Sequence, residues 1–177
     1  ITEDIDNEQR NNSNPDIGAD EFYIPPMAGV YTIGGLNPDY STIAAAVSDL
    51  NTRPVIGQVI FNIRTGTYSE QISISTIYGV SATNRVTFQP DDTASVTITF
   101  EPTSSNNYIV QFDDADYVTF RNLTFTATGA SYGKVFDLKN ESHYITLDGN
   151  TLNGISTTST NANLAVIYSA SGTANDG

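Results

Sequence analysis

Three aspartates lie close together in the middle of the chain, at Asp113, Asp114 and Asp116, and Arg121 follows them. Carboxylate oxygens are the ligands that Ca²⁺ prefers in proteins, so these three are the candidate metal ligands. The simpler interpretation, which we favour, is a solvated turn. No catalytic or ligand-binding residue is assigned. No cofactor is required, and Ca²⁺ stays an open candidate.

A second acidic stretch, near the start of the chain, begins like a calcium-binding loop with Asp4, Asp6 and Glu8. The pattern then fails, because Gln9 stands where such a loop needs glycine and Pro15 stands where it needs a bidentate glutamate. We expect a solvated acidic loop here. A calcium site of another kind, using Asp16 or Asp20, is left open.

The only histidine of the chain, His143, stands in a polar turn just before Tyr144. It has no serine, cysteine or second histidine paired with it in the sequence, so a structural or exposed role is expected. The chain has 10 tyrosines and no tryptophan. Tyr117 and Tyr144 could form a platform for a sugar, but we expect them to stack on one another.

Composition excludes several functions. The chain has only 7 basic residues and 20 acidic residues, which gives a net charge of −13. Such a surface repels phosphate backbones and anionic lipids, so binding of nucleic acid and insertion into a membrane are not expected. The chain has no cysteine, which excludes disulfides and thiol chemistry.

The elements that must position these residues are mostly short strands. Residues 1–26 are polar and end in Pro25-Pro26, and we expect them to be the tail of a preceding module with a linker. One helix is expected at about residues 41–50, with Ser41 as its N-cap. From residue 58 apolar residues alternate with polar ones, which indicates strands that continue through residue 177.

The strongest signal is self-similarity at one fixed shift. YVTFRNLTF (residues 117–125) aligns with YITLDGNTL (residues 144–152), 27 residues later, and VQF (residues 110–112) aligns with FDL (residues 136–138) at a shift of 26. A period of this length built from very short strands is typical of one turn of a β-solenoid. The helix would cap the first turn, and residues 27–177 would form the N-terminal part of a module.

The alignment predicts which side chains point inward. Phe120 and Leu147 should face a dry interior, whereas Thr119 and Thr146 should face outward. It also brings opposite charges together on neighbouring turns, with Asp113 beside Lys139 and Arg121 beside Asp148.

Two segments resemble a known family. VTFRNLTF, with Asn122 at the tight turn, resembles the strand–turn–strand of pectate-lyase-like right-handed parallel β-helices, although Gly149-Asn150 replaces the asparagine in the next turn. The segments VYTIGG, DYSTIAAAVSDLN and GQVIFNIRTGTYSEQISI resemble the opening of such modules in large adhesin-like surface proteins exported by the type IX secretion route. NPDIGADEF resembles their closing motif.

This resemblance implies an all-β, right-handed parallel β-helix in a secreted, cell-surface protein. The function expected first is structural and adhesive, without catalysis, with other modules of the same long chain, surface glycans or other cells as partners. The alternative is a polysaccharide lyase or glycoside hydrolase of the same fold, in which Ca²⁺ and a basic residue such as Arg121 would act on a uronate. A trimeric tail spike is a third candidate.

Overall fold

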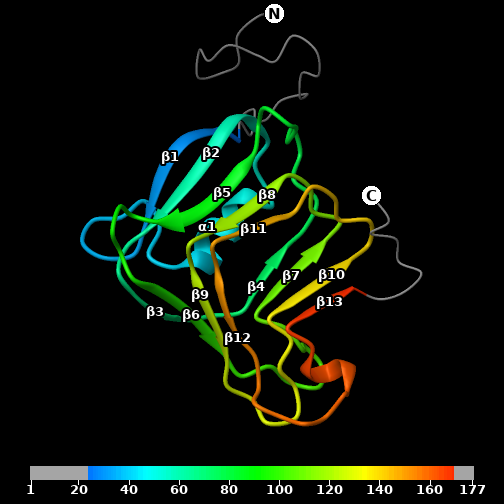
Figure 1. The fold of residues 1–177 in the computed structure, drawn as a ribbon. Coiled ribbons are helices and arrows are strands. Elements are labelled where there is room, and N and C mark those ends of the chain that lie inside the picture. Colours follow the sequence, from blue (N-terminus) through cyan, green and yellow to red (C-terminus); the bar gives the residue numbers. More distant parts are fainter. Residues whose placement is uncertain (1–23, 170–177) are drawn as a thin grey trace, which may run out of the picture.

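The protein is a parallel β-solenoid of about five turns, seen in a computed structural model that describes residues 24–169. Three parallel sheets enclose a triangular interior (Figure 1). The first turn contributes only β1, and each of the four turns after it contributes one strand to each sheet. Every strand pair is parallel, so the antiparallel hairpins of a sandwich are excluded for the described part of the chain.

The first sheet has five strands in the order β1-β2-β5-β8-β11. The other two have four strands each, in the orders β3-β6-β9-β12 and β4-β7-β10-β13. Their bounds, in chain order, are β1 Met27–Ile33, β2 Val55–Ile63, β3 Gly66–Ser69, β4 Ile72–Ile74, β5 Val86–Pro90, β6 Val96–Phe100, β7 Val110–Asp113, β8 Val118–Arg121, β9 Thr124–Ala127, β10 Phe136–Lys139, β11 Thr146–Asp148, β12 Thr151–Asn153 and β13 Ile167–Ser169. A short 3₁₀ turn, η1, occupies Ala162–Leu164.

The strand register confirms the predicted shifts. Val59 pairs with Val86 and Phe125 with Leu152, both 27 positions apart, and Val110 pairs with Phe136 at 26. Not every turn has this length. Ile72 pairs with Val110, a separation of 38 residues, because the loops 75–85 and 101–109 both lie between them. A β-solenoid tolerates such insertions because they leave at the corners and do not disturb the stacked strands.

The start of the solenoid differs from the prediction. Strand pairing begins before residue 58, because β1 precedes the helix and pairs with β2, which itself begins at Val55. The helix α1 spans Ile43–Leu50, and its N-cap is Thr42, whose hydroxyl accepts from the Ala45 amide, instead of Ser41. Glu70 accepts from the amides of Ala44 and Ile43 and so satisfies two further free donors of the first turn.

Helix α1 closes one end of the interior. Its buried face consists of Ile43, Ala46, Val47 and Leu50, which belong to the same core as the strands, and it contacts β4 and β1. Figure 1 shows the helix behind β8 and β11, inside the outline of the three sheets. No helix among residues 24–169 is long and apolar enough to cross a membrane.

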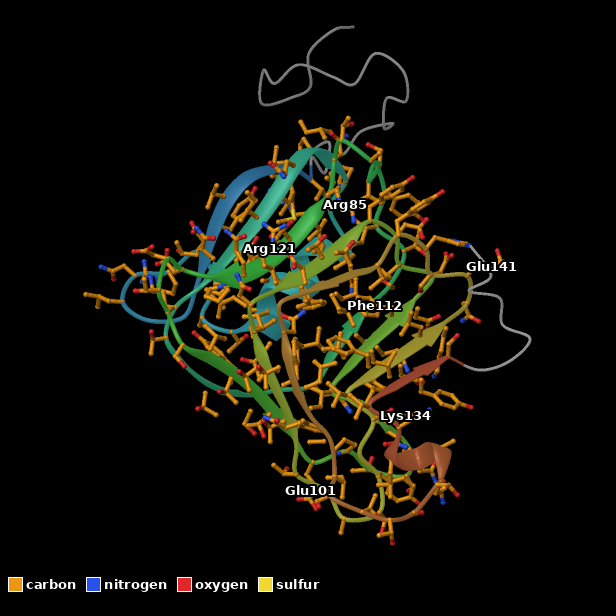
Figure 2. All side chains as sticks on the ribbon, viewed as in Figure 1. Arg85, Glu101, Phe112, Arg121, Lys134 and Glu141 are labelled. Atoms are coloured by element: carbon orange, nitrogen blue, oxygen red, sulfur yellow. The ribbon has the colours of Figure 1, made fainter. Side chains whose placement is uncertain are left out.

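Phenylalanines fill the interior in columns. Phe61, Phe88 and Phe120 stack along the first sheet with ring centroids 4.7 and 4.9 Å apart, and all three are fully buried. Phe112 lies between the sheets and meets Phe120 edge-on, whereas Glu101 and Glu141 point away at the corners (Figure 2). Phe120 is inward as predicted, but Leu147, its partner in the next turn, is only half-buried.

Both threonines were predicted to face outward. Thr146 is exposed as predicted, whereas Thr119 is buried. Thr119 lies on the outer face of β8 between Thr87 and Thr146, yet only 5% of its surface is exposed. The neighbouring threonines and the guanidinium of Arg85, whose Nη2 lies 3.5 Å from the Thr119 hydroxyl, cover it. A side chain can therefore face outward and still be shielded by its own column.

Candidate functional site

The three aspartates lie at the corner between β7 and β8, but they do not converge. The amide of Asn140 donates to Asp113, the hydroxyl of Thr76 donates to Asp114 over 2.7 Å, and the backbone N–H of His143 donates to Asp116 over 2.7 Å. Across residues 24–169, no three acidic or histidine side chains are grouped as metal ligands would be. Each carboxylate therefore accepts from a different neighbour in the stack.

Arg121 points to a different partner. Its Nε lies 2.8 Å from Oδ2 of Asp148, the residue opposite it in the next turn, which confirms the predicted charge pair. The other predicted pair is only partly right. Asp113 and Lys139 are opposite each other in the register, but the Lys139 ammonium lies 3.8 Å from Asp137 on its own strand.

Tyr117 and Tyr144 stack as expected. Their ring centroids are 4.4 Å apart at an interplanar angle of 10°, and the Arg85 guanidinium lies 5.6 Å from the Tyr117 ring on the preceding turn. Both tyrosines have a positive φ, of 54° and 56°, which is unusual for a bulky residue. Tyr144 is 63% exposed, so the column ends in a free aromatic surface.

His143, beside this column, contacts one acidic residue. Its Nδ1 lies 3.6 Å from Oδ1 of Asp116, and this contact is an ion pair only when the imidazole is protonated. The corner that Asn122 forms is offset in the next turn, as the sequence indicated. Gly149 takes the left-handed conformation opposite Asn122, and the Asn150 side chain bonds back to the Phe120 carbonyl and the Leu123 amide.

One polar cluster was missed from the sequence. On the outer face of β10, the Asp137 carboxylate accepts from Lys134 over 3.0 Å and from Gln111 over 3.2 Å. The Lys134 ammonium also lies 3.4 Å from the centre of the Tyr168 ring. The spacing of Lys134 and Asp137 was the available signal, but it cannot show that Tyr168 would cover them. Both charged side chains are nearly buried and paired with each other, with 12% and 6% of their surfaces exposed.

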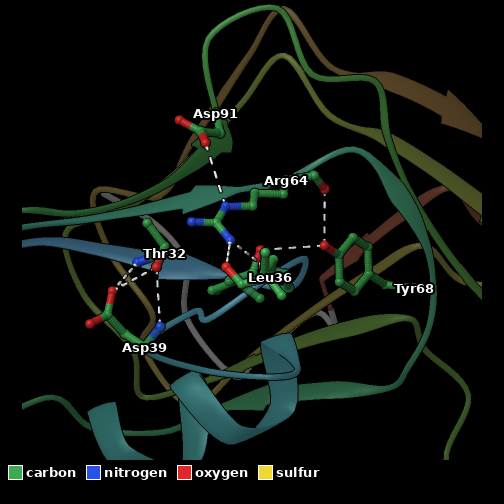
Figure 3. Close-up of polar contacts among 8 residues, drawn as sticks. Thr32, Leu36, Asp39, Arg64, Tyr68 and Asp91 are labelled. Atoms are coloured by element: carbon green, nitrogen blue, oxygen red, sulfur yellow. Dashed lines mark hydrogen bonds and ion pairs between the residues drawn. The ribbon is translucent and has the colours of Figure 1, made fainter.

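Two shallow hollows of about 340 and 420 Å³ flank the loop between β5 and β6. They share Asp92, Thr93 and Ala94. Arg64 lines the larger one, but its guanidinium is already engaged by the carbonyls of Gly34 and Leu36 and lies 3.8 Å from Asp91 (Figure 3). Neither hollow is lined by an aromatic residue. The remaining lining residues are Thr65, Gln89, Pro90 and Asn122.

The same corner fixes the loop that leads into α1. The Asp39 carboxylate accepts from both the backbone N–H and the hydroxyl of Thr32, each over 2.7 Å, and these bonds lower the pKa of Asp39 (Figure 3). The hydroxyl of Tyr40 bonds Asp49, and burial raises the pKa of Tyr40. These groups are committed to structure, which leaves the described corners without an assembled catalytic set.

The remaining candidates, Asp4, Asp6, Glu8, Asp16 and Asp20, lie outside the described residues. No protein-family model, characterised protein or solved structure matched this chain. The fold and the sites above therefore rest on the residues and contacts of the chain itself.

Proposed function

We propose that this chain is a non-catalytic, structural and adhesive rod segment of a large secreted protein on the cell surface. Its partners would be other modules of the same long chain, with surface glycans or other cells as contacts, and export would follow the type IX route suggested by the resemblance. The observation that carries the rod function is the contrast between the two ends of the stack.

Helix α1 covers the interior at one end of the stack, and the last turn among residues 24–169, made of β11, β12 and β13, forms the other end. The inward residues of the last turn are much more exposed than their partners one turn earlier. Phe136 is fully buried, whereas Ile167, which pairs with it from β13, is 52% exposed. Leu147 and Leu152 are likewise only half-buried, although their partners Phe120 and Phe125 are fully buried. A further turn would cover these side chains, as rod growth requires.

The rod function can be tested by lengthening the solenoid with its own sequence. Residues Val118–Tyr144 make one complete turn, and a copy inserted after Tyr144 recreates the native junction, because Thr119 and Thr146 are paired at the same shift. We expect each copy to fold onto the stack and lengthen the molecule by about 4.8 Å, one strand spacing, so four copies add about 19 Å.

Small-angle X-ray scattering measures this length, and thermal unfolding shows whether the inserted turns are stable. A rod predicts a linear increase in length with an unfolding midpoint that does not fall. Inserted copies that hang as an unstructured loop, or that make the protein aggregate, would contradict the proposal.

The enzyme alternative is distinguished by activity. With Ca²⁺ present, we expect the chain to release no unsaturated product from polygalacturonate or alginate, because the carboxylates of residues 24–169 do not converge on one face at adjacent turns. The ultraviolet absorbance of the product double bond checks this directly. Product that accumulates with the native chain and disappears with Arg121→Ala would favour the lyase.

A further inference from the structure

The outer face of the sheet β3-β6-β9-β12 has an unusual composition. Along these strands Tyr68, Ile98, Phe125 and Leu152 point inward, so the residues on either side of each point outward. The outward set has six threonines, one serine and one asparagine, and carries no charge although the chain carries −13. We name this set the threonine face: Thr67, Ser69, Thr97, Thr99, Thr124, Thr126, Thr151 and Asn153.

The threonine face is a regular two-column array. Strand pairing puts Thr67, Thr97, Thr124 and Thr151 in one column, and Ser69, Thr99, Thr126 and Asn153 in the other. Neighbours within a column are one strand spacing apart, about 4.8 Å, and the two columns are two residues apart along each strand, about 6.6 Å. Threonine is branched at Cβ, which restricts χ1, so its methyl and hydroxyl groups repeat with nearly the same orientation.

The hydroxyls of the first column are free to bind water. Within residues 24–169 the side chains of Thr67, Thr97, Thr124 and Thr151 have no hydrogen-bonding partner. In the second column, by contrast, the Thr99 hydroxyl donates to the Thr126 carbonyl over 2.9 Å, and the Asn153 amide donates to the Thr126 hydroxyl over 3.1 Å. One column is therefore available, and the other is held in place by bonds within the sheet.

The other two sheets do not share this property. The outer face of the first sheet carries the Arg121–Asp148 ion pair, and that of the sheet β4-β7-β10-β13 carries Asp137 with its two lysines. Charged groups orient water around themselves, whereas an uncharged array of alternating methyl and hydroxyl groups holds water at positions set by its own spacing. Only the threonine face, of the three described, combines regular spacing, no charge and free hydroxyls.

We propose that the threonine face binds ice. The spacing within each column is close to the shorter repeat of the oxygen lattice in hexagonal ice, and the spacing between the columns is somewhat below the longer repeat. Water held along the free column can therefore join the crystal with limited rearrangement. Behind the face, Ile98 and Phe125 are fully buried, and the Phe125 ring packs edge-on against Phe120 and Phe136, which limits the entropy lost on binding. The aromatic side chains of this sheet point inward, so the face lacks the ring surface on which a sugar would stack. This binding goes beyond the rod function and does not depend on it.

The test uses the 177-residue chain in a nanolitre osmometer together with partitioning into a growing ice hemisphere. We expect thermal hysteresis, faceted crystals and enrichment in the ice relative to serum albumin. Thr124→Tyr, in the middle of the free column, should lose most of the hysteresis, because the ring disrupts the array. The matched control is Thr146→Tyr, an equally bulky change at an exposed threonine of the first sheet, which should keep it.

A gain-of-function variant covers the case in which Thr124→Tyr disturbs the fold. Each inserted copy of Val118–Tyr144 adds one more Thr124–Thr126 row, so hysteresis should rise with the number of copies that fold. Far-ultraviolet circular dichroism and unfolding midpoints report folding separately from ice binding. A well-folded native chain without hysteresis or ice enrichment overturns the proposal. Equal losses in Thr124→Tyr and Thr146→Tyr, or a glycan-array signal that depends on Thr124 without ice enrichment, also overturn it.

Discussion

Replacing Phe120 with alanine is expected to destabilise the solenoid by about 3–5 kcal/mol, the cost of deleting a fully buried aromatic ring. Phe120 is fully buried and contacts four other rings, those of Phe88, Phe112, Phe125 and Phe136, at centroid distances of 4.9–6.0 Å. Neighbouring rings that come from three different sheets cannot all move in to fill the cavity. Urea unfolding measures the loss as a lower midpoint at an unchanged slope.

Leu147 is the matched control for Phe120, because it occupies the same column one turn later. It is half-buried at the open edge, so Leu147→Ala should cost less than about 2 kcal/mol, below the range for a fully buried leucine. The sequence alone placed both side chains in the dry interior. Equal losses would mean that the last turn is as well covered as the one before it, against the end contrast described above.

The second large effect is expected at Gly79, in the loop between β4 and β5. Its φ is +86°, and a Cβ added there would lie 2.1 Å from the Val55 carbonyl oxygen, which is backbone and cannot rotate away. Gly79→Ala should therefore cost about 2–5 kcal/mol, because about 1–2 kcal/mol of left-handed strain adds to an overpacking cost of about 1–3 kcal/mol.

Substitution of Gly29 distinguishes the backbone strain from the overpacking. Its φ is +93°, but an added Cβ would meet no atom within 4 Å, so Gly29→Ala should show the strain alone, about 1–2 kcal/mol. Chemical unfolding of both variants measures the difference. If the two substitutions cost the same, the close approach of Gly79 to Val55 does not exist in solution.

The repeating part of the fold was predictable from the sequence, since apolar residues recur at one shift. Val59 and Val86, like Phe125 and Leu152, are paired as that shift requires. The first strand was not predictable in the same way. β1 contains Gly29 and an exposed Val30, its pairing with β2 is interrupted by a bulge, and the helix separates it from the repeats. Local sequence has no signal for a strand whose apolar partners come 30 positions later.

The partners of charged side chains were predicted less well than apolar contacts, because a long side chain can reach more than one neighbour. The register correctly places Lys139 opposite Asp113, but its ammonium turns toward Asp137, which also holds Lys134. Arg121 also lies opposite its predicted partner, Asp148, and there the ion pair forms. Register thus follows from the sequence, whereas the partner of a flexible charge depends on three-dimensional crowding.

The threonine face was hidden for a related reason. Its rows read TYS, TIT, TFT and TLN in the sequence, which suggest only ordinary alternating strands. Thr67 pairs with Thr97 at a separation of 30, whereas the later rows repeat at 27. The array can be recognised only when the rows are aligned by strand pairing, because insertions at the corners change the number of residues between rows.

The closed end at α1 gives the folding of this chain a direction. Helix α1 blocks the addition of a turn on its side, so β1, β2 and α1 can act as a nucleus from which growth proceeds only toward β11, β12 and β13. Each completed turn is then a template for the next. The chain returns to the same sheet after 26–38 residues, and because the entropy of loop closure grows only slowly with length, the entropic barriers of the steps stay similar. For a chain threaded out of a narrow channel with α1 first, every turn that folds outside would hold the polypeptide against sliding back. Folding in this direction would therefore use the free energy of stacking to drive the polypeptide outward through the channel.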